Sequence, residues 1–161
     1  MKHEMKARYP ASSAVVMKMF ADKNFHTQKL DGMGYAGKYQ VLAQGGDGKK
    51  SFSIKIERKV PVSLPGMGKN APESTVINEE IWDIASKTGK VIVELKGMPL
   101  EMSCITSMKD EGKECVITYA WEVKSKIPLV GGTIEKMVVG DMSKKADEET
   151  QAAIALLDNY R

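Results

Sequence analysis

The chain has 161 residues, of which 28% are charged and 42% hydrophobic, and a formal net charge of +3. This length suits one domain that buries roughly two-thirds of its unfolded surface. Acidic residues lie among the basic ones and few aromatic residues could stack on bases, so no nucleic-acid partner is expected. No apolar run approaches the ~20 residues of a membrane span, and residues 1–20 lack the apolar core of a signal peptide. We therefore predict a cytoplasmic monomer or dimer without integral membrane association.

The first predicted elements are one strand and two short helices. Residues 2–9 are expected to form an edge strand, which Pro10 ends. Ser12 or Ser13 can cap the first helix, and Asp22 can cap a second helix that carries Phe25 toward Leu30. A glycine-rich stretch then ends the helical pattern.

Six strands in three hairpins follow, because apolar and polar residues alternate between turn signals. The turn signals are Asp47-Gly48, Thr88-Gly89 and the segment 110–113. The predicted strands cover residues 35–44, 50–60, 74–86, 90–97, 100–109 and 113–125. Residues 61–72 are expected to form a long loop, and residues 133–161, which lack Pro, a long final helix.

Pairing outward from each turn predicts a register for each hairpin. In the first hairpin the expected pairs are Val41 with Ile54, Tyr39 with Ile56, Ala43 with Phe52, and Lys38 with Glu57. In the second they are Ile84 with Val93 and Trp82 with Leu95. In the third they are Leu100 with Val123, Met102 with Trp121, Cys104 with Tyr119, Thr106 with Ile117, and Met108 with Cys115, and Glu101 faces Glu122 as the one charge conflict.

The two cysteines, Cys104 and Cys115, share a face but lie several residues out of register, so we predict reduced, semi-buried thiols. The chain has only two histidines, His3 and His26, and shows no metal-ligand spacing. We therefore expect neither a metal nor a cofactor, and we assign no catalytic residue.

The order of elements predicts an α+β fold in which a curved seven-stranded antiparallel sheet wraps a long C-terminal helix. Four stretches of sequence resemble a bacterial family of unknown function in the START-like (SRPBCC, helix-grip) superfamily. These are residues 9–25, Arg58-Lys-Val-Pro61, Glu80-Ile-Trp82 and Ile127-Pro-Leu-Val-Gly-Gly-Thr-Ile-Glu-Lys136. The resemblance implies a single domain over residues 1–161 with a deep, mostly apolar cavity between the sheet and the last helix. Members of this superfamily bind lipids, sterols, polyketides or plant hormones, and a minority catalyse reactions.

Polar residues on inward strand positions are the main candidates for a site. Arg58 continues the face of Ile54 and Ile56, while Asn78 and Glu80 continue the face of Trp82. Arg58 and Glu80 could form a structural ion pair at the end of the sheet, or Arg58 could anchor a carboxylate or hydroxyl of a ligand. Both readings remain open from the sequence.

The final helix carries a similar polar interruption. Lys145 and Glu149 lie in the apolar stripe that includes Met142, either as an i,i+4 pair or as contacts to the polar group of a ligand. Gly140 could permit a bend or close packing. Leu64 and Met67 of the long loop could gate a cavity mouth.

We therefore predict a carrier or sensor that binds a small hydrophobic or amphipathic molecule. The alternatives are a cyclase- or dehydratase-type enzyme with Glu80 as general base, or a protein-interaction module with a collapsed core. The candidate ligand-binding residues are Arg58, Asn78, Glu80, Trp82, Met102, Tyr119, Trp121, Met142, Lys145 and Glu149.

Overall fold

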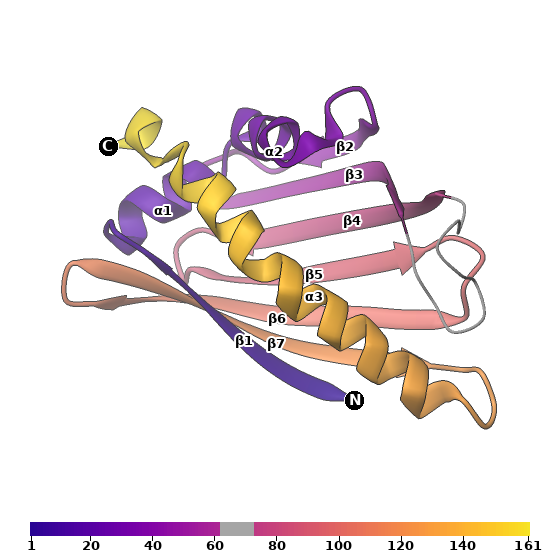
Figure 1. Ribbon diagram of the computed structural model, residues 1–161. Coiled ribbons are helices and arrows are strands. Elements are labelled where there is room, and N and C mark those ends of the chain that lie inside the picture. The colour runs from indigo at the N-terminus through magenta and orange to yellow at the C-terminus, as the bar shows by residue number, and fades with distance from the viewer. Residues whose placement is uncertain (62–72) are drawn as a thin grey trace.

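The computed structural model, which describes residues 1–61 and 73–161, contains the predicted curved antiparallel sheet (Figure 1). Its seven strands follow the spatial order β1-β7-β6-β5-β4-β3-β2, so β1 is an edge strand as predicted. Their bounds are β1 Lys2–Tyr9, β2 Tyr39–Gly45, β3 Ser51–Pro61, β4 Glu73–Asp83, β5 Thr88–Leu95, β6 Leu100–Glu111 and β7 Glu114–Ser125. The predicted helix-grip fold class is thereby confirmed.

The helices lie across one face of this sheet (Figure 1). The first, α1 Ser13–Phe20, is capped by the Ser12 hydroxyl, and α2 Lys23–Leu30 is capped by the Asp22 carboxylate. The long α3 Gly131–Ile154 is shorter than predicted. The chain leaves the α-helix after residue 154 and makes a separate 3-10 turn, Leu157–Tyr160, beside α1.

The first two hairpins have wider turns than the sequence predicted. Val41 pairs with Ile56 rather than Ile54, and a bulge then places Ala43 opposite Lys55. The reason is that the Asp47 carboxylate accepts three backbone N–H groups and organises a longer loop. Trp82 likewise pairs with Gly89 rather than Leu95, because the turn lies at residues 84–87 and not at Thr88-Gly89.

The third hairpin is also shifted by two residues, but its turn is narrow. Its turn has only two residues, Gly112 and Lys113, and the glycine adopts a φ of 63°. Glu101 therefore faces Lys124 instead of Glu122, which removes the predicted conflict between two carboxylates. The other observed pairs are Leu100 with Ser125, Met102 with Val123, Cys104 with Trp121, Thr106 with Tyr119 and Met108 with Ile117.

The buried side chains form three clusters along the sheet, two of which contrast; the third comprises Leu30, Phe52, Ile54 and Ile56. The packed cluster lies under α1 and α2 and comprises Tyr9, Ala11, Val16, Met17, Met19, Phe20, Phe25, Trp82, Met108, Cys115, Ile117, Ala153 and Leu157. The open cluster lies under α3 and comprises Val60, Val76, Val91, Val93, Leu95, Leu100, Met102, Cys104, Val123, Ile134 and Val139. Both cysteines are free, and burial raises the pKa of Cys104 to about 12 and that of Cys115 to about 11.

Candidate functional site

Three adjoining cavities lie between the concave face of the sheet and α3. Their volumes are about 200, 120 and 60 Å³, and the side chains of Asn78 and Glu149 border all three. The lining of the largest is mainly apolar, from Val93 and Leu95 of β5 to Val138 and Met142 of α3. The two smaller cavities extend toward α2, where His26, Lys29 and Glu80 line them. The interior therefore changes from apolar to polar toward α2.

A larger hollow, of about 490 Å³, lies outside this interior. It is bordered by α1, the turn at Gly48 and the side chains of Lys87 and Tyr160. It is more open to solvent than the interior cavities. Because binding sites usually enclose their ligand, we place the candidate site in the interior cavities instead.

Nine of the ten predicted ligand-binding residues line the interior cavities. Arg58, Met102, Met142 and Lys145 border the largest, Tyr119 and Glu80 border the second, and Asn78, Trp121 and Glu149 border more than one. Trp82 does not line them, because its ring is buried in the packed cluster. Leu64 and Met67, the predicted gate, lie outside the described residues.

Arg58 and Glu80 border the same small cavity but do not form the ion pair considered above. Arg58 is registered opposite Val76, whereas Glu80 is registered opposite Ile54. A separation of four residues along a strand corresponds to about 13 Å. Among the described residues, no carboxylate lies within 4.0 Å of the Arg58 guanidinium, which instead lies 5.2 Å from the centre of the Tyr35 ring.

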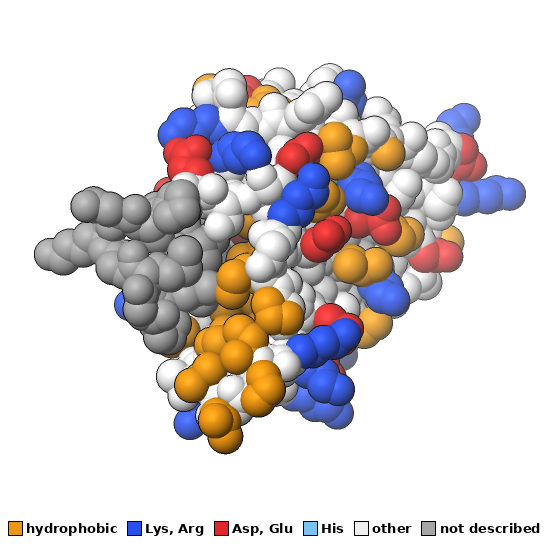
Figure 2. All heavy atoms as spheres, turned by 90° about the vertical axis from the view of Figure 1, so that its right-hand side faces the viewer, with side chains coloured by type: hydrophobic (Ala, Val, Ile, Leu, Met, Phe, Trp, Pro, Cys, Tyr) orange, Lys and Arg blue, Asp and Glu red, His pale blue; other side chains and the backbone are white. Residues whose placement is uncertain are grey.

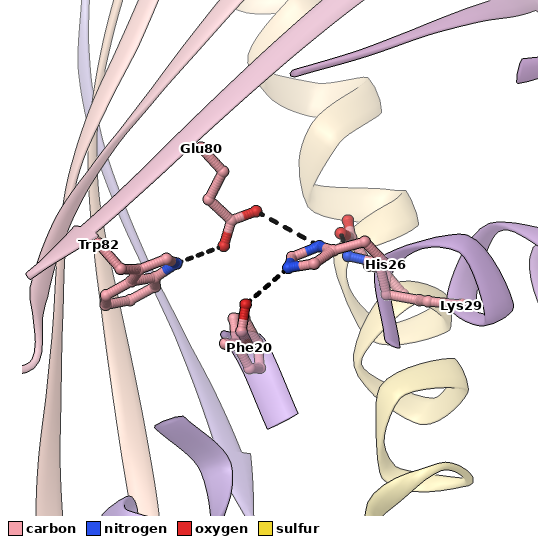
Figure 3. Close-up of polar contacts among 6 residues, drawn as sticks. Phe20, His26, Lys29, Glu80 and Trp82 are labelled. Carbon is pink, nitrogen blue, oxygen red and sulfur yellow. Dashed lines mark hydrogen bonds and ion pairs between the residues drawn. The ribbon is translucent and has the colours of Figure 1, made fainter. Parts of the chain in front are cut away.

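Glu80 is held by a buried polar cluster that Figure 3 shows. The Nε1–H of Trp82 donates to Glu80 Oε1 at 2.6 Å, and His26 Nδ1 lies 3.9 Å from Glu80 Oε2. His26 Nε2 lies 2.7 Å from the Phe20 carbonyl oxygen, which can only accept, so Nε2 carries a proton. Burial lowers the pKa of His26, although the nearby Glu80 carboxylate opposes this effect. A neutral imidazole therefore faces the carboxylate.

Lys145 and Glu149 do not form the i,i+4 pair that was one of the two readings of the sequence. Lys145 Nζ lies 3.1 Å from Asp141, one turn earlier in α3, while Glu149 accepts from Lys29 Nζ of α2 at 2.7 Å. The ammonium of Lys29 lowers the pKa of Glu149. Although 51% of the Glu149 side chain is exposed, it borders all three cavities, so part of that exposure faces the interior.

The sequence prediction missed His26 and Lys29, which α2 contributes to the site. The spacing of Phe25, His26, Lys29 and Leu30 does place them on one helical face, and all four are buried. That face was not recognised because only two of its four residues are apolar. Tyr9 of β1 was also missed; it borders the second cavity, and burial raises its pKa, as it does that of Tyr119. Both phenols are therefore neutral hydrogen-bonding groups.

Comparison with known proteins identifies the family. Residues 4–156 match the family model described as "Protein of unknown function (DUF2505)". The chain belongs to this family. No curated protein matches the sequence.

Solved structures with the same fold include the ZhuI aromatase/cyclase from Streptomyces sp. R1128, with 12% identity and a TM-score of 0.64 over 98% of this chain and 93% of that one. Norcoclaurine synthase from Thalictrum flavum, in complex with dopamine and hydroxybenzaldehyde, has 18% identity and a TM-score of 0.62 over 100% and 88%. A START superfamily protein from Mycobacterium smegmatis has 12% identity and a TM-score of 0.58 over 99% of both chains. At these identities the likeness shows the fold alone, which this DUF2505 chain shares with a START superfamily protein.

In residues 1–61 and 73–161, no helix is long and apolar enough to cross a membrane.

Proposed function

We propose that this DUF2505 protein binds a small hydrophobic or amphipathic molecule in the interior cavities, as a carrier or sensor. The observation that supports this best is the interior itself, in which an apolar wall of β5 and α3 residues meets polar groups of β3, β4 and α2. A molecule with an apolar body and a polar group matches both parts.

Burial of the apolar body would provide most of the binding free energy, at roughly 25 cal/mol per Å² of apolar surface removed from water. Met102 and Met142 can adapt to its shape, because the thioether side chain is unbranched and flexible. Arg58, Asn78 and Glu149 would orient the polar group. Norcoclaurine synthase, which shares the fold, is described in complex with dopamine and hydroxybenzaldehyde, and this supports a small-molecule ligand.

Native mass spectrometry of the purified protein, followed by solvent extraction of anything bound, tests this proposal. We expect a discrete adduct of lipid-like or aromatic mass that is lost on denaturation. A clean apo mass, together with no change in melting temperature over a panel of lipids, fatty acids and aromatic acids, would contradict the proposal.

An enzyme that uses the same cavity is the second candidate, favoured by the position of Glu80. One carboxylate oxygen is fixed by Trp82, and the side chain borders the two polar cavities, as expected for a general base. The test is Glu80→Gln, which keeps the shape and removes the base. Loss of turnover with retained ligand binding would support catalysis, whereas unchanged turnover would exclude Glu80 as the base.

A protein-interaction role is the third candidate, and one surface feature favours it. Hydrophobic side chains gather at the end of the molecule where β7 leads into α3 (Figure 2). Leu129 is fully exposed, and Val130 and Met137 are partly exposed.

The expected cytoplasmic location and the monomer-or-dimer state also remain predictions. Solution size measured over a range of protein concentrations would separate self-association through this end from the carrier role.

A further inference from the structure

The interior contains polar atoms that the protein itself does not satisfy. In the described part of the chain, four buried side-chain polar atoms have no hydrogen-bond partner: Arg58 Nε, Asn78 Oδ1, Thr106 Oγ1 and Trp121 Nε1. The residues of three of them border the largest cavity. Because about 90% or more of buried polar groups in native proteins are paired, their concentration at one cavity indicates where an occupant would bind.

Two of these atoms define the chemistry of that occupant. The Nε–H of arginine and the Nε1–H of tryptophan can only donate hydrogen bonds. Arg58 lies on β3 and Trp121 on β7, with three strands between them, so the donors face the interior from different parts of the curved sheet. An occupant that satisfies them must therefore present acceptor oxygens. Because Arg58 is charged, it favours the stronger acceptor of the two.

The charges around the cavities point to Arg58 as the group that would hold an anion. Lys29 is paired with Glu149, and Lys145 is paired with Asp141. The charge of Arg58 helps to lower the pKa of Glu149 at longer range, but the Glu149 carboxylate already accepts a hydrogen bond from Lys29 Nζ. Arg58 has no carboxylate partner among the described residues, and residues 62–72 contain no Asp or Glu that could supply one. Its guanidinium is held by the Tyr35 ring, which leaves its hydrogen-bonding capacity for a ligand.

We propose that the ligand is a small organic acid whose carboxylate meets Arg58 and whose apolar body lies against Val93, Leu95 and Met102. This inference rests on the proposed function and specifies its ligand class. The volumes limit the size of the acid. The two larger cavities, of about 200 and 120 Å³, favour a small acid over a long-chain lipid.

A matched pair of probes tests the charge requirement. Octanoate and octanamide have the same size, but only octanoate is anionic at pH 7.5. Binding is followed through the fluorescence of Trp121, which borders the cavity, and by calorimetry. Hydrogen bonds to charged groups are worth about 1.5–3 kcal/mol, so octanoate should bind at least about tenfold more tightly than octanamide.

Arg58→Gln locates this preference. The variant should lose the preference and bind the two probes with equal affinity. Lys59→Gln is the matched control, because it removes the same charge from an exposed side chain next along β3. Lys59→Gln should keep the full preference for octanoate. Trp121→Phe should abolish the fluorescence change while calorimetry still detects binding.

The outcomes separate this inference from the broader proposal. If the wild type binds octanoate and octanamide with equal affinity, the proposal of an organic acid at Arg58 is wrong. It is also wrong if Arg58→Gln keeps the full preference for octanoate. Neither result contradicts small-molecule binding itself. If neither probe binds and the purified protein carries no adduct, the inference and the carrier function fail together. Arg58→Lys tests whether a loss of preference comes from misfolding. It keeps the positive charge, so it should retain part of the preference for octanoate.

Discussion

The packed and open clusters are built on the same sheet, yet the largest interior cavity borders only the open one. The packed cluster contains Phe20, Phe25 and Trp82, and two short helices cover it; the Phe20 ring meets Trp82 edge to face and lies tilted against Phe25. The buried members of the open cluster include no aromatic residue, and α3 alone crosses that part of the sheet (Figure 1). Its Val and Leu side chains fill less of the space under α3 than aromatic rings would. The cavity is therefore a consequence of side-chain size.

Truncating one large side chain in each cluster should give the largest contrast. Phe25→Ala should destabilise the fold by about 3–5 kcal/mol, because it opens a new void among closely packed neighbours. Met102→Ala should cost no more than about 2 kcal/mol, since Met102 already borders a cavity and has fewer contacts to lose. Urea denaturation measures both free energies of unfolding. Equal losses would mean that the interior under α3 is filled in solution.

The ion pair of Lys29 with Glu149 joins the two regions, and breaking it should have an intermediate effect. Glu149→Gln leaves the buried Lys29 ammonium without its counter-charge. A fully buried pair costs about 3–5 kcal/mol to break, but the Glu149 side chain is half exposed, so we expect about 2 kcal/mol at pH 7. The double variant Lys29→Met/Glu149→Gln should recover most of that loss.

The pH dependence of this effect has a defined sign. The folded state holds the pKa of Glu149 below its ordinary value of 4.5, so its contribution to stability is present above that value and is lost as the pH falls through the lower, folded pKa. The difference in unfolding free energy between the wild type and Glu149→Gln should therefore shrink below about pH 4.5. A difference that stays constant to pH 3 would show that the carboxylate's charge is not responsible.

These residues also show what the sequence could predict. The strand-borne site residues were found because alternation fixes which face a side chain takes, and most of the register errors were shifts by an even number of residues. Val93 faces the interior whether it pairs with Ile84, as predicted, or with Asn78, as observed. The registers themselves failed because they depend on turn details such as the hydrogen bonds of Asp47, which turn-residue statistics do not contain.

Pairing across the fold was beyond the sequence for a different reason. Lys29 and Glu149 are 120 positions apart, and their contact depends on how α2 and α3 pack over the sheet. Local spacing favoured Glu149 with Lys145, because i,i+4 pairs are common on helices. In the structure Lys145 forms its ion pair with Asp141, and Glu149 forms its ion pair with Lys29.

Filling the cavity should make the open cluster resemble the packed one. Val93→Phe places an aromatic ring into the largest cavity from β5, so we expect a gain of about 1 kcal/mol in stability and loss of binding of small hydrophobic probes. Ile92→Phe is the control. The Ile92 side chain is next to Val93 along β5 and lies on the exposed face of the sheet, so this substitution should leave binding unchanged. Probe binding by Val93→Phe at wild-type affinity would place the binding site elsewhere.

The smallest expected effect separates two glycines, one in each region. A Cβ at Gly89 would meet the Ile81 carbonyl oxygen at 2.5 Å and the Trp82 ring at 2.9 Å, so Gly89→Ala should destabilise the packed region. A Cβ at Gly140 in α3 would meet nothing within 4 Å, so close packing does not explain that glycine. Gly140→Ala should therefore stabilise the helix by about 0.5–1 kcal/mol, which thermal denaturation can measure. A loss of stability instead would mean that α3 needs the freedom of glycine at this position in order to span the cavity.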